Sequence, residues 1–270
     1  MAALAGVVAC DAAGQAERVE VGSHAAALRV VSLSAAASRF VVALGAQDLL
    51  VAIDEPSSRV PGLGRLPVVD RETALRLSPD IVLVASLPAV DDPSLDALRA
   101  GGAELIEFEP HDFEDLFALC RDLGGRLVGE ARARSFEREL SRPLAFVGGS
   151  SFGQSRPRVV AVVGFDPLEL AGGHSFETDL IEIAGGTSVT HGGDESRLRV
   201  REDSWLALVP DLILVVTPRE PTLAERSAAL EALPAGYPVD FFVFEPERFW
   251  LRDAEETAQR LRAVLLRASR

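Results

Sequence analysis

The stretch Arg29-Val30-Val31-Ser32-Leu33 recurs as Arg158-Val159-Val160-Ala161-Val162, at an offset of 129 residues. A second stretch, Pro79-Asp80-Ile81-Val82-Leu83-Val84, recurs as Pro210-Asp211-Leu212-Ile213-Leu214-Val215, at an offset of 131. Because both repeats place apolar strands in the same order, we expect the chain to build two similar lobes. Two lobes enclose a cleft, and small molecules bind preferentially at such junctions. The duplication therefore indicates function through architecture rather than through a catalytic motif.

The composition excludes several classes of function. The 270 residues carry a formal net charge of -14, and all 27 basic residues are Arg. An acidic surface repels the phosphate backbone of nucleic acids and anionic membranes, so neither is an expected partner. Without Lys the chain cannot form a P-loop, a pyridoxal phosphate Schiff base or a Ser-x-x-Lys hydrolase site. Apolar residues make up 48 % of the chain, which is ample material for the core of two lobes.

The two cysteines, Cys10 and Cys120, lie in different sequence contexts. Cys120 belongs to a helical apolar pattern and is expected to be an inert core residue. Cys10 follows the short apolar run Val7-Val8-Ala9, which is typical of the end of a bacterial lipoprotein signal, where that Cys is lipidated. The basic start and full apolar core of such a signal are missing, so we expect a truncated leader, with coincidence as the alternative. No apolar run approaches the roughly 18 residues of a membrane-spanning helix.

From Arg29 onward, short apolar strands alternate with helices. Ser34 is a good N-cap for a helix that ends at Leu44, with Gly45 as its stop. The continuous apolar run at 80–85 is typical of a buried parallel strand. We expect further strands near 49–53, 105–108, 158–163, 211–216 and 240–244, and helices near 71–77 and 94–100 and after Ser175, Asp203 and Asp253. This alternation predicts parallel sheets with right-handed crossovers.

The longest helical pattern begins at Asp112 and extends to about residue 141. Its apolar residues follow spacings of three and four: Phe113, Leu116, Phe117, Cys120, Leu123, Leu127 and Ala131. Gly124-Gly125 weakens a helix by about 1 kcal/mol per Gly, yet the pattern favours one long helix over two short ones. The predicted fold is therefore α/β, with two doubly wound Rossmann-like lobes joined by one long backbone helix. The expected segments are a leader and tether at 1–28, an N-terminal lobe at 29–111, the connecting helix at 112–142 and a C-terminal lobe at 143–270.

Several short motifs follow one another in a specific order and spacing. The first half has Arg-Val-Val-Ser-Leu, a helix ending Ala43-Leu44-Gly45, and Glu72 seven residues before Pro79-Asp80. After the long helix, the second half has Ser175-Phe176, Asp179-Leu180, Ala184-Gly185-Gly186 and Pro210-Asp211. Over roughly residues 29–268, this arrangement resembles the periplasmic solute-binding proteins that serve ABC importers of cobalamin, haem and ferric siderophores.

The resemblance implies an extracytoplasmic solute-binding protein of an ABC importer. Such a protein captures a metal chelate or a corrinoid-type ligand between its lobes and delivers it to the permease. A location in the periplasm or on the extracytoplasmic face follows, with Cys10 as the lipid anchor. We expect a monomer with no cofactor and no enzymatic activity. A ligand sensor or interaction module of the same fold, without a role in transport, is the alternative.

The resemblance also implies how the protein would dock. In such proteins one acidic residue on each lobe contacts an Arg-lined pocket on each copy of a dimeric permease in the inner membrane. Counting seven residues back from Pro79 gives Glu72, and from Pro210 gives Asp203, with Glu202 adjacent. Charge pairs of this kind mainly fix register and speed encounter. The alternative for these acids is stabilisation of a helix dipole from the first turn.

Ligands of doubly wound sheets contact the loops at the carboxyl ends of the strands. In this chain those loops are 34–38, 86–90, 164–176, 217–221 and 245–252, and the candidate residues are Ser34, Leu87, His174, Phe176, Arg219, Trp250 and Arg252. Aromatic side chains there would cover a flat macrocycle or catecholate, while Arg would pair with carboxylate or phosphate groups of the ligand. Core packing is the alternative for Phe176 and Trp250, and a solvated charge is the alternative for Arg252.

Two other chemistries fit the sequence less well. His174, Glu177, His191 and Asp194 could bind a metal, or either His could be an axial haem ligand, but their spacing matches no closed zinc pattern. The segment 173–177 nearly forms the nucleophile elbow of a serine hydrolase, but Glu177 replaces its final Gly and no strand leads into Ser175. Ser175 is better explained as the N-cap of the following helix. We therefore predict neither a metal site nor a catalytic residue.

Overall fold

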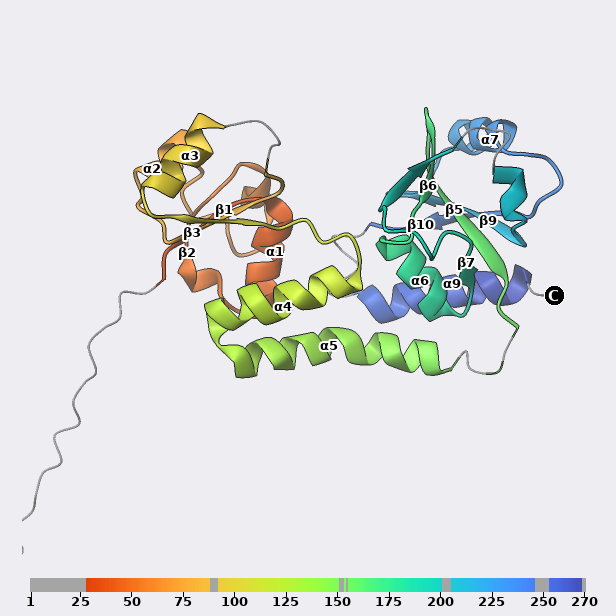
Figure 1. Ribbon diagram of the computed structural model, residues 1–270, viewed down its shortest axis with the longest axis horizontal. Helices are drawn as coiled ribbons and strands as arrows, with labels where there is room; N and C mark the ends of the chain where they lie inside the picture. The colour runs from red at the N-terminus through yellow and green to blue at the C-terminus, as the bar shows by residue number, and fades with distance from the viewer. Residues whose placement is uncertain are drawn as a thin grey trace, which may run out of the picture.

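The computed structural model describes residues 28–87, 92–150, 153, 155–200, 205–245 and 253–268. Within these residues, two α/β lobes lie side by side, and a pair of helices runs beneath them (Figure 1). Five residues singled out in the sequence lie outside the described ranges: Cys10, Glu202, Asp203, Trp250 and Arg252.

The N-terminal lobe is a parallel sheet with short helices around it. Its elements, with 3-10 helices written η, are β1 (Val30–Leu33), α1 (Ala35–Leu44), η1 (Gln47–Leu49), β2 (Leu50–Ile53), η2 (Pro56–Arg59), α2 (Arg71–Leu75), β3 (Ile81–Val84), α3 (Pro93–Ala100) and β4 (Glu104–Glu107). The strand order is β2-β1-β3-β4, and each neighbouring pair is parallel. This order is doubly wound, as the alternation of strands and helices predicts.

The C-terminal part follows two helices, α4 (Phe113–Val128) and α5 (Glu130–Gly149). Its elements are β5 (Arg158–Phe165), β6 (Leu168–Ala171), α6 (Phe176–Ala184), β7 (Thr187–Ser188), β8 (Arg197–Arg199), η3 (Trp205–Leu208), β9 (Leu212–Thr217), α7 (Leu223–Ala232), β10 (Val239–Val243) and α9 (Ala254–Ala268). The strand order is β10-β9-β5-β6-β8, and β7 also pairs with β5. The parallel strands β7, β5, β9 and β10 thus repeat the order of β2, β1, β3 and β4.

The duplication read from the sequence is confirmed residue by residue. Val30 pairs with Ile81 in the first lobe, and Val159 pairs with Leu212 in the second. The backbone N–H of Arg29 donates to the Asp80 carboxylate at 2.7 Å, and that of Arg158 donates to Asp211 at 2.8 Å. The repeated Arg and Pro-Asp motifs therefore make the same hydrogen bond, which ties the start of the first strand to the start of the third in each lobe.

Helices α1 and α6 occupy equivalent places and have the caps that the sequence predicts. The Ser34 and Ser175 hydroxyls each accept a hydrogen bond from the backbone N–H three residues later, at 3.3 Å. Both helices end at a glycine with positive φ, +86° at Gly45 and +96° at Gly185, a conformation that costs glycine little.

The prediction of one helix over 112–141 is wrong, although a long helix does join the lobes. Gly129, with φ of +82°, ends α4 and starts α5, and the two helices run antiparallel in Figure 1. Gly124 lies inside α4, where a Cβ would stand 3.4 Å from the Cβ of Ala133. Gly124 therefore lies at the contact between α4 and α5, whereas a Cβ at Gly125 would meet nothing within 4 Å, and neither glycine is the break.

Helix α5 is the element that spans both lobes. At its start, the Phe136 ring lies 5.8 Å from that of Phe40 in α1. Near its end, the Val147 carbonyl accepts a hydrogen bond from Arg262 of α9 at 3.3 Å. Its 20 residues rise about 30 Å. No helix in the described residues has both the length and the apolar character needed to cross a bilayer.

Elements β6, β8 and α7 were not predicted from the sequence. Strand β6, between β5 and α6, and strand β8, after β7, pair with each other and run antiparallel to their neighbours, an addition that the first lobe lacks. Helix α7 lacks an inward apolar stripe, since its Leu223 and Leu230 are exposed. Short strands and a helix without amphipathic periodicity carry little sequence signal.

Candidate functional site

A cavity of about 380 Å³ lies where the carboxyl ends of the N-terminal strands face the second lobe. In Figure 1, β4 runs toward the second lobe, and β10 ends on the side that faces the first. All the lining residues but one follow β1, β2, β3 or β4 or begin α1; the exception is Phe176, the first residue of α6. The lining comprises Leu33, Ser34, Ala35, Ala36, Asp54, Pro56, Ala85, Ser86, Phe108, Glu109, Pro110 and Phe176. We name this space the interlobe cavity.

A network of buried serine hydroxyls lies next to the interlobe cavity. The Ser38 hydroxyl lies 2.9 Å from that of Ser32 and 2.8 Å from that of Ser57. Ser32 also donates to the carbonyl of Ser34, the cap of α1, at 3.0 Å. Because these hydroxyls satisfy one another, they fix the strand end, the helix start and η2 relative to each other. The wall of the cavity is thus held by local hydrogen bonds.

The charged residues that line the interlobe cavity, Asp54 and Glu109, are both acidic. Asp54 accepts a hydrogen bond from the backbone N–H of Ser57 at 3.0 Å, which sets its position. Neither residue was predicted from the sequence. Asp54 directly follows β2 and Glu109 lies two residues after the end of β4, so applying the rule on carboxyl ends to every strand would have found them. An acidic lining favours hydroxyl, amine or other donor groups on a ligand.

The start of α6 is joined to the segment that leaves β4. The backbone N–H of Phe176 donates to the His111 carbonyl at 2.7 Å, and that of Phe113 donates to Asp179 at 2.9 Å. The Phe113 and Phe176 rings meet edge to face at 5.3 Å. Burial and, to a smaller extent, the nearby Asp112 raise the pKa of Asp179 to about 6, although the hydrogen bond from the Phe113 N–H acts to lower it. This contact sets how the lobes face each other.

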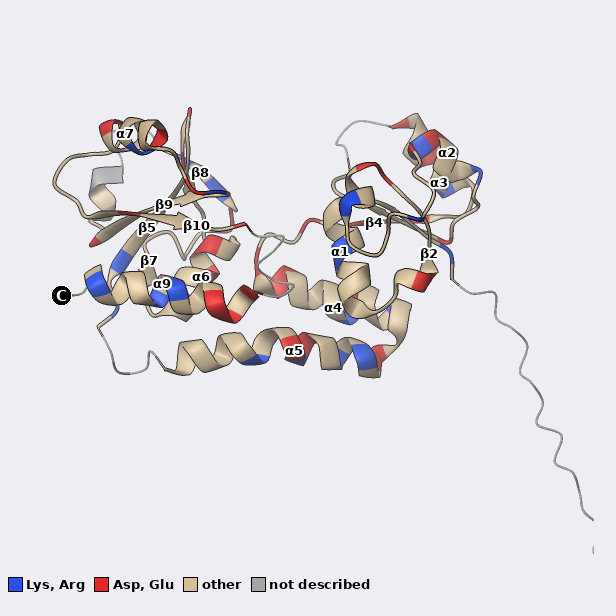
Figure 2. Ribbon diagram, turned by 180° about the vertical axis from the view of Figure 1, so that it is seen from behind, with Lys and Arg blue, Asp and Glu red and all other residues tan. Residues whose placement is uncertain are grey.

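His174 faces the same segment. Its Nε2 lies 3.3 Å from Asp112 and 3.1 Å from Asp115, at the start of α4. Figure 2 shows acidic residues gathered where α4 begins near α6. Donor atoms of the three side chains lie within 4.8 Å of one another, a spacing that a metal ion could bridge. Direct contact of the imidazole with the two carboxylates accounts for the same arrangement without a metal.

The predicted ligand residues fall into three groups. Ser34 and Phe176 line the interlobe cavity. Three others lie elsewhere: His174 at the junction, Leu87 with its N–H donating to Glu107 at 2.9 Å, and Arg219 in a two-bond ion pair with Glu225. Trp250 and Arg252 are outside the described residues.

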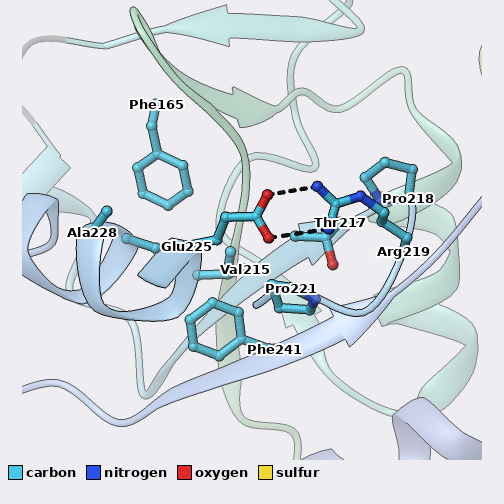
Figure 3. A pocket seen from close by; sticks show the side chains of 10 residues that line it. Phe165, Val215, Thr217, Pro218, Arg219, Pro221, Glu225, Ala228 and Phe241 are labelled. Atoms are coloured by element: carbon cyan, nitrogen blue, oxygen red, sulfur yellow. Dashed lines mark hydrogen bonds and ion pairs between the residues drawn. The ribbon is translucent and has the colours of Figure 1, made fainter. Parts of the chain in front are cut away.

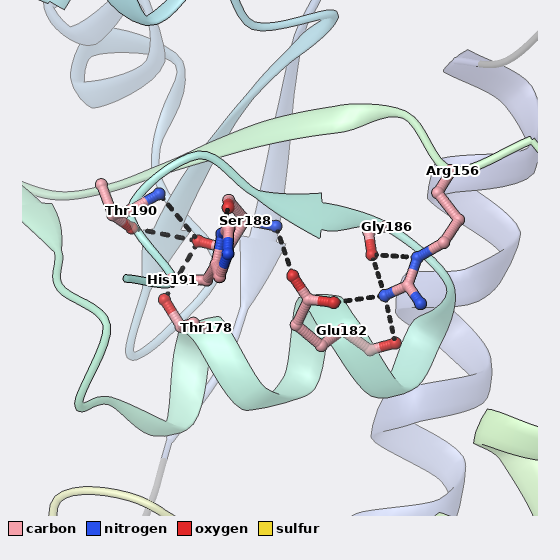
Figure 4. Close-up of polar contacts among 7 residues, drawn as sticks. All are labelled: Arg156, Thr178, Glu182, Gly186, Ser188, Thr190 and His191. Carbon is pink, nitrogen blue, oxygen red and sulfur yellow. Dashed lines mark hydrogen bonds and ion pairs between the residues drawn. The ribbon is translucent and has the colours of Figure 1, made fainter. Parts of the chain in front are cut away.

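Of the four residues considered for a metal, Glu177 and His191 have partners of their own, whereas His174 and Asp194 line one pocket together with Asp112 and Asp115. Glu177 binds Arg197 through two hydrogen bonds of 3.0 and 3.1 Å. His191 places Nδ1 2.9 Å from the Ser188 carbonyl, in the polar cluster of Figure 4. In that cluster the Ser188 hydroxyl also contacts Thr178 at 3.1 Å. These contacts fasten β7 to α6 and give His191 a structural role.

Ser175 has the role of a helix cap rather than of a nucleophile. Its hydroxyl donates to the Gly172 carbonyl at 2.7 Å while accepting from the Thr178 N–H. The residue is 1 % exposed. The neighbouring His174 points to Asp112 and Asp115. A buried hydroxyl that already makes two hydrogen bonds does not supply the exposed oxygen that a serine hydrolase requires.

Glu72, the first-lobe docking candidate, lies exposed in the first turn of α2. The cap of this helix is Asp70, which accepts a hydrogen bond from the Thr73 N–H at 2.8 Å. Asp203 and Glu202 lie outside the described residues, next to η3. Figure 1 places α2 and η3 on the outer parts of the two lobes, away from α5.

Comparison with protein-family models and with curated proteins gives no match. Solved structures do match over most of the chain. The periplasmic haem-binding protein RhuT from Roseiflexus sp. RS-1 superposes with a TM-score of 0.67 at 18 % identity, covering 90 % of this chain and 100 % of its own. The periplasmic haem-binding protein HutB of Vibrio cholerae superposes with a TM-score of 0.69 at 20 % identity, covering 88 % of this chain and 98 % of its own. The periplasmic vitamin B12-binding protein BtuF of Vibrio cholerae superposes with a TM-score of 0.64 at 18 % identity, covering 90 % of this chain and 98 % of its own.

These matches extend over both lobes and the helices between them. At identities of 18 to 20 % they establish the fold and leave the ligand open. The two α/β lobes, the facing strand ends and the spanning helix α5 agree with that fold. The chain has the two-lobed fold of periplasmic ligand-binding proteins, which confirms the resemblance at the level of fold.

Proposed function

We propose that this protein is an extracytoplasmic solute-binding protein that captures a ligand between its lobes and delivers it to the permease of an ABC importer. The observation that carries the proposal is the interlobe cavity, which is built from the carboxyl ends of β1, β2, β3 and β4 and closed by Phe176 from the other lobe. Parallel sheets bind ligands at that edge. The similarity to RhuT, HutB and BtuF supports the same role.

The proposed ligand class is a metal chelate or corrinoid-type molecule. Ser34, Phe176, Asp54 and Glu109 would contact it from the interlobe cavity. Leu87, His174, Arg219, Trp250 and Arg252 remain candidates for its outer parts. We expect no covalent chemistry on the ligand and no resident cofactor. Solved proteins of this fold bind haem or vitamin B12, as their names state.

Docking is proposed to use one acidic residue on each lobe, Glu72 on the first and Asp203 or Glu202 on the second. An exposed apolar side chain accompanies the first of these places, since Leu75, one turn after Glu72, is 39 % exposed. In the second lobe Val209, six residues after Asp203 in the sequence, is 61 % exposed. An acid beside an exposed apolar residue suits an interface in which an Arg pairs with the carboxylate and a small apolar contact excludes water. The partner would be a permease dimer in the inner membrane, and the binding protein would act as a monomer.

The proposed location is the periplasm or the extracytoplasmic face of the membrane, with a lipid on Cys10 as the anchor. Incorporation of labelled palmitate into the protein, lost in Cys10→Ala, tests the anchor. Labelling that persists in the variant contradicts it.

Thermal-shift screening tests the binding role most directly. The panel is cobalamin, cobinamide, haem and ferric siderophores of hydroxamate and catecholate type. A member present at 100 times its Kd should raise the free energy of unfolding by about 2.7 kcal/mol. No shift with any member contradicts the proposed ligand class. If a compound raises the melting temperature but cells that lack the protein still take up that compound normally, the sensor is favoured over the transporter.

A further inference from the structure

A second cavity lies in the C-terminal lobe, between α7 and the sheet. Its volume is about 330 Å³, and it shares no lining residue with the interlobe cavity. The walls include Phe165 from β5, Val215 and Thr217 from β9, Phe241 from β10, and Ala228 and Ala229 from α7 (Figure 3). We name it the α7 pocket.

The internal repeat explains why this cavity exists. Helix α3 joins β3 to β4, and α7 joins the equivalent β9 to β10. Their N-caps, Asp92 and Thr222, are 130 residues apart, and the same offset carries Leu98 onto Ala228. Leu98 is fully buried in the first lobe. At this offset the C-terminal lobe therefore has an alanine, itself exposed, where the N-terminal lobe buries a leucine.

The same offset carries a second core leucine onto a charged residue. Leu95, 1 % exposed, corresponds to Glu225, which lines the α7 pocket. The leucines that α7 does have point outward, with Leu223 84 % and Leu230 50 % exposed. Ala229 is the one buried residue of this helix. The helix thus turns the buried Ala229 toward the sheet, while the exposed Ala228 and Glu225 line the open side of the pocket.

The walls of the α7 pocket are mainly apolar and partly aromatic. Phe165 is 37 % exposed, and in Figure 3 its ring lies on one side of the pocket with that of Phe241 on another. The Arg226 guanidinium lies 4.8 Å from the Phe241 ring centroid, which orients that ring. An apolar cavity of about 150 Å³ can take up benzene, so the α7 pocket has room for two fused rings. Aromatic walls favour a flat ligand.

The charges at the rim of the pocket neutralise each other. Arg219 donates to Glu225 through two hydrogen bonds, of 2.6 and 3.1 Å, and the Thr222 N–H donates to the same carboxylate at 2.7 Å. These hydrogen bonds, and most of all those from Arg219, lower the pKa of Glu225 to about 2, so the carboxylate stays ionised. A charged ligand would have to break this pair, whereas a neutral hydroxyl can hydrogen-bond to it.

One polar atom in the pocket wall is left without a partner. The Thr217 hydroxyl is buried and has no hydrogen bond within the described part of the chain. Most buried hydroxyls are paired, so an unpaired one calls for an explanation such as a bound water or ion. Thr217 ends β9 and comes directly before the loop that carries Arg219.

We propose that the α7 pocket is a second binding site, which takes an uncharged, flat, mainly apolar small molecule of about two fused rings bearing a hydroxyl group. The rings would lie against Phe165 and Phe241, and the hydroxyl would face Arg219 and Glu225. The site is independent of the ligand that the interlobe cavity holds.

Calorimetric titration of the full chain with 1-naphthol tests this site. The wild-type protein should bind one equivalent, and Ala228→Leu, which restores the side chain of the first lobe, should bind at least about tenfold more weakly. Naphthalene-1-sulfonate, with the same rings and a charge, should bind the wild type at least about tenfold more weakly than 1-naphthol. Leu230→Ala, on the exposed side of the same helix, is the matched control and should bind as the wild type does.

Equal binding of 1-naphthol by the wild type and Ala228→Leu overturns the proposal, as does the absence of wild-type binding at about 1 mM. In the second case, a more stable Ala228→Leu would identify the cavity as a packing defect. Ala228→Val replaces Ala228→Leu if the larger side chain prevents folding. Equal affinity for naphthalene-1-sulfonate overturns the neutral class of ligand.

Discussion

Helix α3 fills the space beside its sheet with Leu95 and Leu98, whereas α7, at the equivalent place in the second lobe, leaves a cavity beside Glu225 and Ala228. The first helices differ as well. The start of each helix lines the interlobe cavity, but only the start of α6 also binds the segment leaving β4, through Phe176 and Asp179. Both lobes nevertheless keep the same strand order and the same Arg-to-Asp hydrogen bond.

This comparison separates what the duplication conserves from what it leaves free. The backbone path and its hydrogen bonds are the same because they build each sheet. Side chains differ where a lobe contacts the other lobe or lines a cavity. Ser38 and Asp179, each four residues after a helix cap, show the contrast: Ser38 bonds to hydroxyls of its own lobe, and Asp179 accepts from the segment that leads to the other.

The largest expected effect tests whether the two lobes are equivalent in docking. Reversing both charges, in Glu72→Arg with Asp203→Arg, should abolish uptake because each lobe would then repel an Arg-lined pocket. Each single variant should lose at least about tenfold, and ligand affinity should stay near normal. Uptake in cells and calorimetry on the purified protein measure the two quantities.

The exposed pair Asp48→Arg with Glu231→Arg is the control for the total charge change. Equal loss of uptake and of ligand affinity would reject the docking role. Loss from only one of the two single variants would show that one lobe dominates the contact.

The next effect concerns the packing of α3 and of α7 against their sheets. Leu98→Ala removes a fully buried side chain and should lower the free energy of unfolding by about 3 kcal/mol. Ala228→Leu, the reverse change at the equivalent position, should leave it unchanged or raise it. Urea denaturation measures both. A loss of similar size in Ala228→Leu would mean that the α7 pocket has no room for the side chain, against the equivalence of the two helices.

A smaller effect concerns the contact that Asp179 makes and Ser38 does not. The pKa of Asp179 is raised in the folded protein from 3.8 to about 6, so the folded state holds its proton to higher pH than the unfolded state. Stability should therefore fall as pH rises through this window. Asp179→Asn keeps an acceptor for the Phe113 N–H and loses the charge. It should gain about 1 to 2 kcal/mol at pH 8, after allowance for solvent screening, and nothing at pH 3.

Thermal denaturation of both proteins from pH 3 to pH 8 measures this difference. A constant difference across the range would show that Asp179 does not titrate in this window. A variant less stable at pH 8 would show that the charged hydrogen bond to Phe113 outweighs burial.

The smallest effect compares the hydrogen bonds that both lobes share. Asp80→Ala and Asp211→Ala should each lower the free energy of unfolding by about 1 kcal/mol, since each removes an acceptor for the backbone N–H of an Arg in an exposed setting. The two losses should agree within about 0.5 kcal/mol. A large inequality in urea denaturation would mean that the repeated motif stabilises only one lobe.

Much of the fold could be predicted because its signals are local. Serine caps at Ser34 and Ser175, and apolar strands between turn residues, are readable one segment at a time. The break at Gly129 was missed because the apolar spacing continues from Leu127 to Ala131 across it. Only the packing of α4 on α5 shows that the chain turns there.

The candidate site was harder to predict than the fold. Ser34 and Phe176 were found because they start helices after strands, while Asp54 and Glu109 were missed because the loops after β2 and β4 were not considered. Arg219 was expected to be available to a ligand, but its pairing with Glu225 depends on α7, a helix with no inward apolar stripe. Partners brought together by tertiary packing have no signature in sequence spacing.

One measurement tests the central claim that ligand binds between the facing strand ends. The panel member with the largest thermal shift is titrated by calorimetry into the wild type, Ser86→Trp and Ala131→Trp. Ser86 is exposed and lines the interlobe cavity, whereas Ala131 is exposed on α5. We predict at least about tenfold weaker binding by Ser86→Trp and unchanged binding by Ala131→Trp. Wild-type affinity in a folded Ser86→Trp protein would contradict the account.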